Sequence, residues 1–438
     1  MNVILLSGGS GKRLWPLSND IRSKQFLKLF RNGDGYESMV QRVWRQLNAV
    51  DSSVNVTIAT GKTQVSAIRN QLGEKVSVCI EPCRRDTFPA IALATAYLRD
   101  VCHLSEDEVV VVCPVDPYVD DSYYETVRKL SVLAGKGGAA LSLMGISPSY
   151  PSEKYGYIIP QTKNEVSRVL EFREKPDRET AEKYIARNAL WNAGVFAFRI
   201  GYLLEKAHSL MDFKDYHDLL GKYETLTKIS FDYAVVEKEK SIQVLRYSGE
   251  WKDVGTWNTL SEVMTDRTKG RVLLDETCTN TNVVNELDIP ILCMGLENMI
   301  VAASGDGILI SDKERSGYMK SYVEKIETDV RFAEKSWGTY TVVDAAPGSL
   351  TVRVNMKKGE RMSYHMHQHR NEVWTVVSGK GKAVIDGEER NLKRGDVVVI
   401  SAGMKHMLEA DTAMDVLEIQ IGDEISVHDK IKFAWDKI

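Results

Sequence analysis

Apolar runs alternate with amphipathic stretches from the start of the chain to about Ser147. Between these runs, Met39, Val43 and Leu47 recur at helical spacing, and Pro89 stands where a second helical pattern begins. Alternating strands and helices predict a mainly parallel sheet that helices cover on both faces. The apolar runs that predict strands lie at residues 3–6, 54–59, 76–80, 109–113 and 139–144.

A less regular alternation continues to about residue 262. Helices are expected near residues 179–187 and 230–238. Strands are expected at residues 155–159, 166–172, 195–198 and 242–247. We therefore expect an α/β domain at residues 1–265, with a Rossmann-like, mixed and mainly parallel sheet.

The pattern changes after about Lys269. Residues 271–312 form short apolar runs broken by Asn, Asp and Gly, and a charged helix is expected at about residues 312–327. From Trp337 onward the pattern predicts only strands, at residues 339–343, 350–356, 372–377, 381–385, 396–400 and 415–421. We expect a β-rich linker subdomain at residues 266–330 and an all-β barrel at residues 331–438.

Composition agrees with a soluble globular chain of several domains. The 438 residues exceed one domain of roughly 150 residues, and 43% of them are hydrophobic and 27% charged. The net charge of -4 gives no excess of basic residues for nucleic acid, so local cations must hold any anionic ligand. The composition leaves the oligomeric state open, a homo-oligomer included.

The cysteines and the N-terminus point to a reduced, cytoplasmic protein. The six cysteines form no CxxC pair, which argues against a zinc finger or a disulfide scaffold. No basic segment precedes a long apolar run, and no run of about 18 apolar residues occurs. Neither a signal peptide nor a membrane span is expected.

The first predicted strand runs into the sequence SGGSGKRLWPLS. In the turn formed by Gly8, Gly9, Ser10 and Gly11, backbone N–H groups can converge on an anion because glycine has no Cβ to block their approach. Lys12 and Arg13 add positive charge, at the edge where open α/β sheets bind ligands. The spacing matches neither the dinucleotide fingerprint nor the Walker motif, so the glycines alone fit an ordinary tight turn.

Together with KQFL at residues 24–27, this sequence resembles the signature of the mannose-1-phosphate guanylyltransferases, a family of sugar-phosphate nucleotidylyltransferases. The usual sequence in that family is close to SGGSGTRLWPLS and PKQFL, so Lys12 here replaces Thr and Ser23 replaces Pro. Further matches follow in the family's order: EPCRRDT at residues 81–87, YGYI at 155–158, EKP at 174–176, WNAGVF at 191–196, FDYA at 231–234 and WKDVGTW at 251–257.

The resemblance implies transfer of a nucleotidyl group from GTP to α-mannose 1-phosphate, with release of pyrophosphate. It assigns Lys24 to the triphosphate and Lys175 to the sugar phosphate. It assigns Glu174, Asn192 and the Gly156 backbone to the sugar hydroxyls. The expected nucleotide-binding residues are Gly8, Gly9, Ser10, Gly11, Lys12, Arg13, Glu81 and Arg85.

Two carboxylates are candidates for holding Mg²⁺, which prefers carboxylate and phosphate oxygens. Asp116 follows the strand predicted at residues 109–113, and Asp253 lies in WKDVG. In the family, His usually follows the carboxylate that corresponds to Asp116, but Pro117 follows it in this chain. The metal-holding carboxylate therefore remains, while any role of that His is lost. The expected catalytic residues are Arg13, Lys24, Asp116 and Asp253.

Several motif residues also have structural interpretations. Trp191, Trp251 and Trp257 are expected to pack in the core. Glu81 fits either the N-terminal cap of the following helix or recognition of the base. Asp232 fits a carboxylate at a helix start, with at most a side role in the substrate site.

A second group of candidate residues lies near the end of the chain. His365 follows Gly359 after five residues, and His367 follows His365 after one. Glu372 then follows after four residues and Gly379 after six, and His406 comes later in the chain. This spacing is the two-part cupin pattern. In a strand His365, His367 and His369 would share a face. We expect His365, His367, Glu372 and His406 to bind Zn²⁺, Mn²⁺, Fe²⁺ or Ni²⁺, whereas His369 is left as a supporting or exposed residue.

The longer guanylyltransferases carry such a cupin at this end, where it isomerises mannose 6-phosphate. Their usual segment resembles QMHYHRAEHW, so His365 replaces Gln and Val373 replaces His. Lys432 stands where that family commonly shows Arg, and Arg to Lys is not conservative at a phosphate site. The resemblance therefore predicts an intact metal site and leaves the isomerase activity open.

Two alternatives to this guanylyltransferase function stay open at this stage. The same reaction could use another sugar 1-phosphate or another nucleoside triphosphate, because nothing in the composition excludes either. A nucleotide-sugar sensor, which would bind without turnover, is disfavoured by the intact Arg13, Lys24, Asp116, Lys175 and Asp253.

Overall fold

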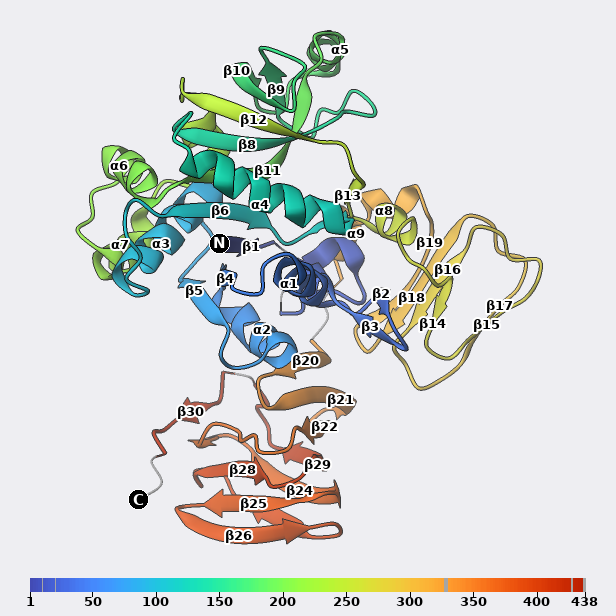
Figure 1. Ribbon diagram of the computed structural model, residues 1–438. Coiled ribbons are helices and arrows are strands. Elements are labelled where there is room, and N and C mark those ends of the chain that lie inside the picture. Colours follow the sequence, from blue (N-terminus) through green and yellow to red (C-terminus); the bar gives the residue numbers. More distant parts are fainter. Residues whose placement is uncertain (10, 20, 327–329, 427, 436–438) are drawn as a thin grey trace. The chain divides into compact units, whose positions relative to one another are not determined.

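The computed structural model describes residues 1–9, 11–19, 21–326, 330–426 and 428–435 (Figure 1). Contacts divide the chain into two compact units. The first unit comprises Met1–Ser10, Lys24–Val65 and Lys75–Thr265, and the second comprises Gly11–Ser23, Ser66–Glu74 and Asp266–Ile438. Within the described ranges, no helix is both long and apolar enough to cross a membrane.

The first unit is built on a nine-stranded sheet with the order β5-β4-β1-β6-β11-β8-β12-β10-β9. Strands β5, β4, β1 and β6 are parallel, whereas β11 and β10 run antiparallel to their neighbours. The bounds are β1 Asn2–Ser7, β4 Asn55–Gly61, β5 Ser77–Glu81, β6 Val109–Pro114, β8 Leu141–Ile146, β9 Tyr157–Pro160, β10 Val166–Arg173, β11 Leu190–Arg199 and β12 Ile242–Tyr247.

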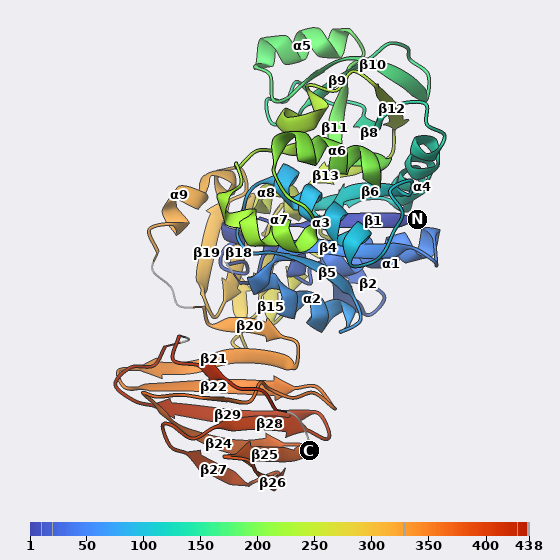
Figure 2. The same cartoon turned by 90° about the vertical axis from the view of Figure 1, so that its left-hand side faces the viewer.

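Helices cover both faces of this sheet, as Figures 1 and 2 show. Polar residues fix the helix starts: the Ser38 side chain accepts from the Gln41 N–H in a capping box, and Asp120 accepts from the Ser122 N–H. One face carries α1 (Met39–Val50) and α4 (Asp121–Gly135), and the other carries α3 (Thr87–Asp100), α6 (Ile200–Leu210) and α7 (Tyr216–Lys222).

The expected strands and helices of this unit largely agree with the structure. All five strands predicted in the first part exist, as β1, β4, β5, β6 and β8. The helix expected near residues 179–187 is α5 (Arg178–Ala186). The segment expected as a helix at 230–238 is a π-helix over Asp232–Val236, a rare form that is frequent at functional sites.

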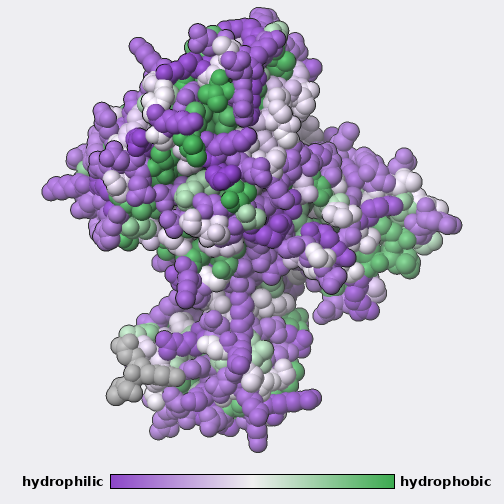
Figure 3. All heavy atoms as spheres, in the orientation of Figure 1, coloured by the Kyte–Doolittle hydropathy of each residue, from purple (hydrophilic) through white to green (hydrophobic). Residues whose placement is uncertain are grey.

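The connecting part of the second unit is β-rich, as expected. A four-stranded sheet has the order β14-β16-β18-β19, and β15 pairs with β17 in parallel. Leu273 on β15, Leu292 on β17 and Met294 just after β17 are exposed, and the right-hand side of Figure 3 shows a hydrophobic area where Figure 1 labels these strands. The bounds are β14 Thr268–Lys269, β15 Val272–Leu274, β16 Asn282–Asn285, β17 Ile291–Cys293, β18 Met299–Ser304 and β19 Gly307–Asp312.

The charged helix expected at 312–327 is wrong in its extent. The structure has a short 3-10 turn at Arg315–Tyr318 and a single helical turn, α9, at Lys320–Val323. Gly317 lies within the first turn and costs helix stability, and the N-cap residues Glu314 and Met319 make no side-chain cap hydrogen bond. Position 327 lies outside the described residues.

The C-terminal part of the second unit folds into two sheets that enclose an apolar core containing Val352, Trp374, Val398 and Val416. Their orders are β20-β21-β22-β29-β24-β27 and β26-β25-β28-β23-β30. The bounds are β20 Phe332–Lys335, β21 Gly338–Ala346, β22 Ser349–Met356, β23 His365–Met366, β24 Asn371–Ser378, β25 Lys380–Ile385, β26 Glu388–Lys393, β27 Val397–Ile400, β28 His406–Ala410, β29 Met414–Ile421 and β30 Ile431–Lys432.

Candidate active site and metal centre

Asp116 and Asp253 come together through a small two-stranded sheet. Asp116 follows β6 and directly precedes β7 (Pro117–Val119), which pairs antiparallel with β13 (Trp251–Asp253). In this register Asp253 stands opposite Pro117, next to Asp116. Burial raises the pKa of Tyr155, and the charges of Asp253 and Asp116 raise it further. The Tyr155 phenol therefore lies in the field of both carboxylates.

Lys24 contacts the first of these carboxylates. Its Nζ lies 3.0 Å from Asp116 Oδ2, and both side chains are partly exposed. The buried Gln25 fixes the neighbouring backbone, because its Nε2 donates to Ser7 Oγ at 3.2 Å, at the end of β1. A cation that is paired but accessible can exchange its carboxylate partner for a phosphate.

The glycine-rich loop begins at the carboxyl end of β1. Gly8 and Gly9 are exposed, and a Cβ at either would meet no atom within 4 Å. Gly9 has φ +121°, which side chains rarely adopt. Arg84 Nη2 donates to the Gly9 carbonyl at 2.9 Å.

Gly11 begins a short 3-10 helix, Gly11–Leu14, in which Lys12 is half-buried and Arg13 exposed. Ser10, also expected in the nucleotide site, lies outside the described residues.

Glu81 and Arg85 both contact the segment around Tyr223. The Tyr223 hydroxyl donates to Glu81 Oε2 at 2.7 Å, and burial raises the pKa of Glu81. Arg85 donates to the carbonyls of Tyr223 and Glu224. The capping interpretation of Glu81 is wrong, because Asp86 is the N-cap of α3 and accepts from the Thr87 N–H.

Gly156 lies in one group with the three other residues expected to bind the sugar 1-phosphate: Glu174, Lys175 and Asn192. A Cβ on Gly156 would lie 2.5 Å from Glu174 Oε2 and 3.4 Å from Asn192 Cβ, so only glycine fits between these side chains. The Asn192 N–H donates to the Gly156 carbonyl at 2.8 Å. Lys175 Nζ lies 2.7 Å from Glu174 Oε1 and is half-exposed. The group combines a buried acid, an amide and an accessible cation.

Asp232 belongs to the same group, beyond the role that the sequence predicted. Its Oδ1 accepts from Asn192 Nδ2 at 2.7 Å. Burial, and then the charge of Glu174, raise the pKa of Asp232 to about 7. The raised pKa of Asp232 makes this end of the site sensitive to protons near neutral pH.

The three tryptophans pack as expected. Trp257 is fully buried, and Trp191 is 4% exposed. Trp251 is half-buried and makes an edge contact with Tyr155, the two ring centroids lying 5.4 Å apart. This aromatic packing fixes Tyr155 beside the carboxylates.

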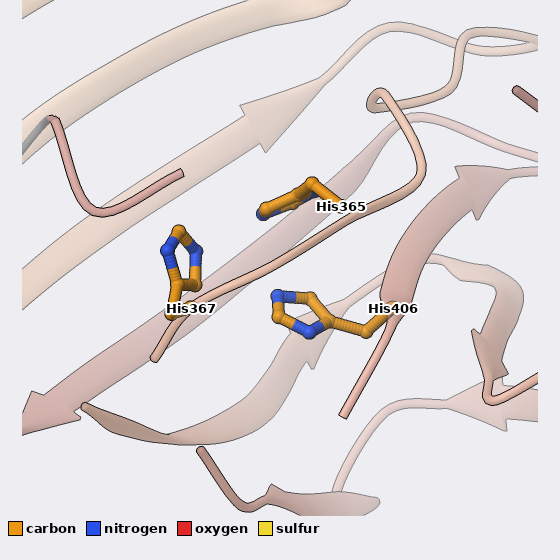
Figure 4. A group of neighbouring side chains, drawn as sticks. All are labelled: His365, His367 and His406. Atoms are coloured by element: carbon orange, nitrogen blue, oxygen red, sulfur yellow. The ribbon is translucent and has the colours of Figure 1, made fainter. Parts of the chain in front are cut away.

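The second constellation lies in the C-terminal sheets. His365, His367 and His406 are buried, and one ring nitrogen of each lies within 4.8 Å of the others. The register pairs His365 of β23 directly with His406 of β28, while His367 follows β23. Figure 4 shows the three rings turned toward a common point.

Backbone carbonyls fix the tautomers of these rings. His365 Nδ1 lies 2.6 Å from the Ser363 carbonyl, and His406 Nδ1 lies 2.9 Å from the Met404 carbonyl. His367 Nδ1 contacts the Asp429 carbonyl. A carbonyl only accepts, so each Nδ1 carries the proton and each neutral ring keeps its lone pair on Nε2.

The charge of the site agrees with neutral imidazoles. Burial, followed by the charge of Lys430, lowers the pKa of His365 to about 2. Burial also lowers the pKa of His367 to about 4, although the contact with Asp429 acts in the opposite direction. Both rings are therefore unprotonated at neutral pH and able to bind a cation.

Glu372 completes the group. Its Oε1 lies 3.2 Å from His367 Nε2, and its Oε2 lies 3.4 Å from His406 Nε2. Among the described residues, His406 Nε2 is buried beside this carboxylate without a hydrogen-bond partner, an arrangement that a cation shared with Glu372 would satisfy. Trp374 Nε1 donates to Oε2, and Arg370 Nε donates to Oε1 at 3.2 Å. The donor set fits a divalent transition metal.

His369 does not join this site. It is exposed, because β23 ends at Met366 and the chain then turns. The Asp429 carboxylate accepts the backbone N–H groups of Gln368 and His369 and so stabilises this turn. The alternation expected across residues 365–369 is therefore wrong after His367.

Comparisons with known proteins cover nearly all of the chain. The family model for nucleotidyl transferases matches residues 2–270, and that for the mannose-6-phosphate isomerase C-terminal region matches residues 324–434. A mannose-1-phosphate guanylyltransferase from Escherichia coli K12 is 31% identical, over 98% of this chain and 97% of that protein. The chain belongs to the mannose-1-phosphate guanylyltransferase family.

Other similarities agree with this family. The xanthan biosynthesis protein XanB from Xanthomonas campestris pv. campestris strain B100 is 30% identical, over 98% of this chain and 97% of that protein. A solved structure described as mannose-1-phosphate geranyltransferase from Thermus thermophilus has a TM-score of 0.60 at 28% identity, covering 74% of this chain and 98% of that one. This member of the guanylyltransferase family is a nucleotidyltransferase with a cupin domain that resembles mannose-6-phosphate isomerase.

Sequence reasoning missed several residues of the cupin constellation. Arg370 is buried and contacts both His367 Nε2 and Glu372. Glu418 is buried on β29, where burial, followed by the charge of Glu372, raises its pKa to about 7. Burial also lowers the pKa of Lys430 to about 8, while Glu418 acts to raise it. These residues lie on separate strands or beyond them, so no spacing in the sequence linked them.

Proposed function

We propose that this protein transfers the guanylyl group of GTP to α-D-mannose 1-phosphate. A phosphate oxygen of the sugar 1-phosphate forms a bond to the α-phosphorus of GTP, and the bond from that phosphorus to the bridging oxygen breaks. GDP-mannose and pyrophosphate are the products. Full-length similarity to a guanylyltransferase supports this reaction. The observation that carries the proposal is the β7–β13 pairing, which puts Asp253 beside Asp116.

The triphosphate is the ligand that we assign to the glycine-rich loop. Backbone N–H groups of Gly8, Gly9, Ser10 and Gly11, with Lys12, Arg13 and Lys24, would offset its charge. The 3.0 Å pair between Lys24 and Asp116 supports this role, because it holds a cation ready beside a carboxylate. Glu81 and Arg85 are assigned to the nucleotide as well.

Asp116 and Asp253 are assigned to Mg²⁺, which would shield the phosphate charges that develop during transfer. Their fit to this ion rests on the oxygen donors and on their partial exposure. Tyr155 borders both acids, and its raised pKa keeps the phenol protonated. A protonated phenol can donate to a carboxylate oxygen and orient it.

The sugar phosphate is assigned to the group around Gly156. Lys175 would bind the phosphate, and Glu174 and Asn192 would accept and donate hydrogen bonds to the sugar hydroxyls. The close fit of Gly156 beside Glu174 and Asn192 supports this assignment, since a side chain at that position would displace the Glu174 carboxylate.

A matrix of substrates tests the reaction. Purified full-length protein with Mg²⁺ is incubated with each of four nucleoside triphosphates and several sugar 1-phosphates, and pyrophosphate release is measured. We expect GTP with mannose 1-phosphate to give the highest kcat/KM. A different best pair would change the assigned substrates, and tight binding of GDP-mannose without pyrophosphate release would favour a sensor.

For the cupin domain we propose a divalent transition metal, Zn²⁺, Mn²⁺, Fe²⁺ or Ni²⁺, held by His365, His367, Glu372 and His406. Such an ion would polarise a bound carbonyl or hydroxyl oxygen. Support comes from the ring nitrogens of the three histidines, one of each lying within 4.8 Å of the others, and from the carbonyls that bond each Nδ1. Elemental analysis of protein purified without chelators tests the site.

A second candidate function is isomerisation of mannose 6-phosphate in this cupin. Aldose–ketose isomerisation moves a proton between neighbouring carbons, which requires a base with a pKa near neutrality. Glu418 and Lys430, with pKa values of about 7 and about 8, favour this candidate. Formation of fructose 6-phosphate by the full-length protein, and its loss in Glu418→Gln, is the expected result. No fructose 6-phosphate from the metal-loaded protein would limit the cupin to binding.

A further inference from the structure

The signature segment Gly11–Ser23, which carries Lys12 and Arg13, is attached to the β-rich subdomain. Both belong to the second unit. Arg22 Nη1 and Nη2 donate to Glu286 Oε2 at 2.6 Å and Oε1 at 3.0 Å. The two residues of this bidentate contact lie 264 positions apart in the sequence. Glu286 directly follows β16, in the β-rich subdomain, to which the proposed function assigns no role.

The Arg22–Glu286 pair is shielded from water. The Arg22 side chain is 9% exposed, and that of Glu286 is 22% exposed. Burial acts to raise the pKa of Glu286, but the charge and hydrogen bonds of Arg22 outweigh it and lower that pKa. The Arg22 guanidinium also lies over the ring of Phe332, 4.8 Å from its centroid. A buried, bidentate pair fixes orientation more firmly than an exposed one.

Two further hydrogen bonds join the segment to the turn between β18 and β19. Asn19 Nδ2 donates to Asp306 Oδ2 at 2.7 Å, and Ser304 Oγ donates to the Pro16 carbonyl at 2.7 Å. Asn19 Oδ1 in turn accepts the backbone N–H of Arg22, so the two anchored residues are linked.

The same turn also packs against the segment. A Cβ on Gly307, which has φ +150°, would lie 2.4 Å from Trp15 Cζ2. Only glycine allows Trp15 this close approach. The subdomain therefore holds the segment at four points, at Trp15, Pro16, Asn19 and Arg22.

We propose that the β-rich subdomain positions the GTP-binding segment, and that Glu286 and Asp306 are positioning residues for Lys12 and Arg13. This inference rests on the proposed function, in which those two cations contact the triphosphate. Arg13 is exposed on a single 3-10 turn, so local hydrogen bonds fix it weakly. Anchors at Trp15, Pro16, Asn19 and Arg22, which follow Arg13 in the sequence, reduce the number of conformations from which GTP must select.

A positioning role differs from a purely structural role in its kinetic effect. Loss of an anchor frees the segment, and GTP must then order it on binding, which raises the KM for GTP. The contacts of mannose 1-phosphate with Lys175 and Asn192 are unaffected. A structural role would instead lower thermal stability and leave both KM values unchanged.

The test uses full-length Glu286→Gln, in which the amide keeps the shape but loses the charge that pairs with Arg22. We expect the KM for GTP to rise about tenfold, which equals about 1.4 kcal/mol of binding free energy, with the KM for mannose 1-phosphate within about twofold. The control is Asp312→Asn. Asp312 accepts from Asn298 Nδ2 at 2.8 Å and from the Arg315 N–H, so its contacts stay within the subdomain.

A second variant keeps the test decisive if Glu286→Gln fails to fold. Asp306→Asn is isosteric and can still accept the Arg331 N–H, but its amide would face the donating Asn19 Nδ2. We expect a smaller rise in the KM for GTP. Unchanged KM values in the folded variants, or an equal rise in Asp312→Asn, would overturn the inference. If wild-type protein releases no pyrophosphate at all, the proposed function fails instead.

Discussion

The two constellations of this chain differ in how far they are assembled before a ligand arrives. In the cupin, His365, His367 and Glu372 are 3%, 2% and 2% exposed, and backbone carbonyls already fix the rings. In the transferase domain, Asp253 is exposed and Lys24 is partly exposed. The cupin residues form a buried site, whereas the transferase residues form an exposed surface on which charged side chains are paired.

This difference follows from what each would bind. A single metal ion is small enough to be enclosed. Burial of its ligands is costly when no ion is bound, so the surrounding structure must hold these ligands in place. A triphosphate and a sugar phosphate bring their own charges, and they must enter and leave during every turnover. Cations that pair with nearby carboxylates, as Lys24 does with Asp116, remain ordered until the anion replaces that partner.

The largest effect is expected at the open site. Asp253→Ala should lower the kcat of pyrophosphate release by roughly a thousandfold or more, because no other carboxylate stands opposite Pro117 in the β7–β13 register. The far-ultraviolet circular dichroism spectrum should stay unchanged. The matched control is Glu262→Ala, which removes a similar charge from a side chain 60% exposed and paired with Lys252. Comparable activity in the two variants would refute the assignment of Asp253.

At the buried site, His367→Ala should remove the cupin metal and leave pyrophosphate release within about twofold. Loss of one of four ligands should weaken binding by at least about a hundredfold. Elemental analysis and the pyrophosphate assay on the same samples check both parts. His369→Ala, two positions along and exposed, should keep its metal. Metal retained by His367→Ala would mean that the ligands lie elsewhere.

The next effect concerns the sugar phosphate. Lys175→Ala should raise the KM for mannose 1-phosphate by about 10-fold to 100-fold, because a charged hydrogen bond contributes about 1.5–3 kcal/mol. The KM for GTP should change much less. Lys183→Ala removes an exposed lysine that pairs with Glu179 and serves as the control. Equal increases in both KM values would point to a general loss of structure.

The smallest effect is on stability. Burial and Glu174 raise the pKa of Asp232 to about 7, so the folded chain holds this proton more tightly than the unfolded chain, whose pKa is about 3.9. The stabilisation is complete below about pH 4 and is lost as the pH rises through about 7. Asp232→Asn does not titrate. Its melting temperature relative to wild type should therefore rise by about 3 °C between pH 5 and pH 8, whereas parallel profiles would contradict the raised pKa.

Much of the fold could be predicted because burial leaves a regular pattern. The strand β1 is apolar from Val3 to Leu6, and the alternation of such strands with helices predicted a mainly parallel sheet. The helix expected at 312–327 failed because charge and spacing there resemble a helix, whereas Gly317 and the missing caps limit it to short turns.

The two constellations were predictable to different degrees. The four proposed cupin ligands follow from spacing, because strands alternate their side chains and neighbouring strands pair. Their partners Arg370, Glu418 and Lys430 could not be predicted, because pairing of distant strands brings them together. Likewise the sequence named Asp116 and Asp253 but gave no sign that Tyr155 lies beside them. Such contacts depend on tertiary packing and not on local pattern.

The most direct test of the open site is metal binding to it alone. Mn²⁺ is titrated into full-length His367→Ala protein with saturating GTP and followed by electron paramagnetic resonance, with and without the additional change Asp253→Asn. We expect one Mn²⁺ to bind per chain in the presence of GTP, and Asp253→Asn to weaken that binding by at least about tenfold. Equal Mn²⁺ affinity in the two proteins would contradict the role given to the paired carboxylates.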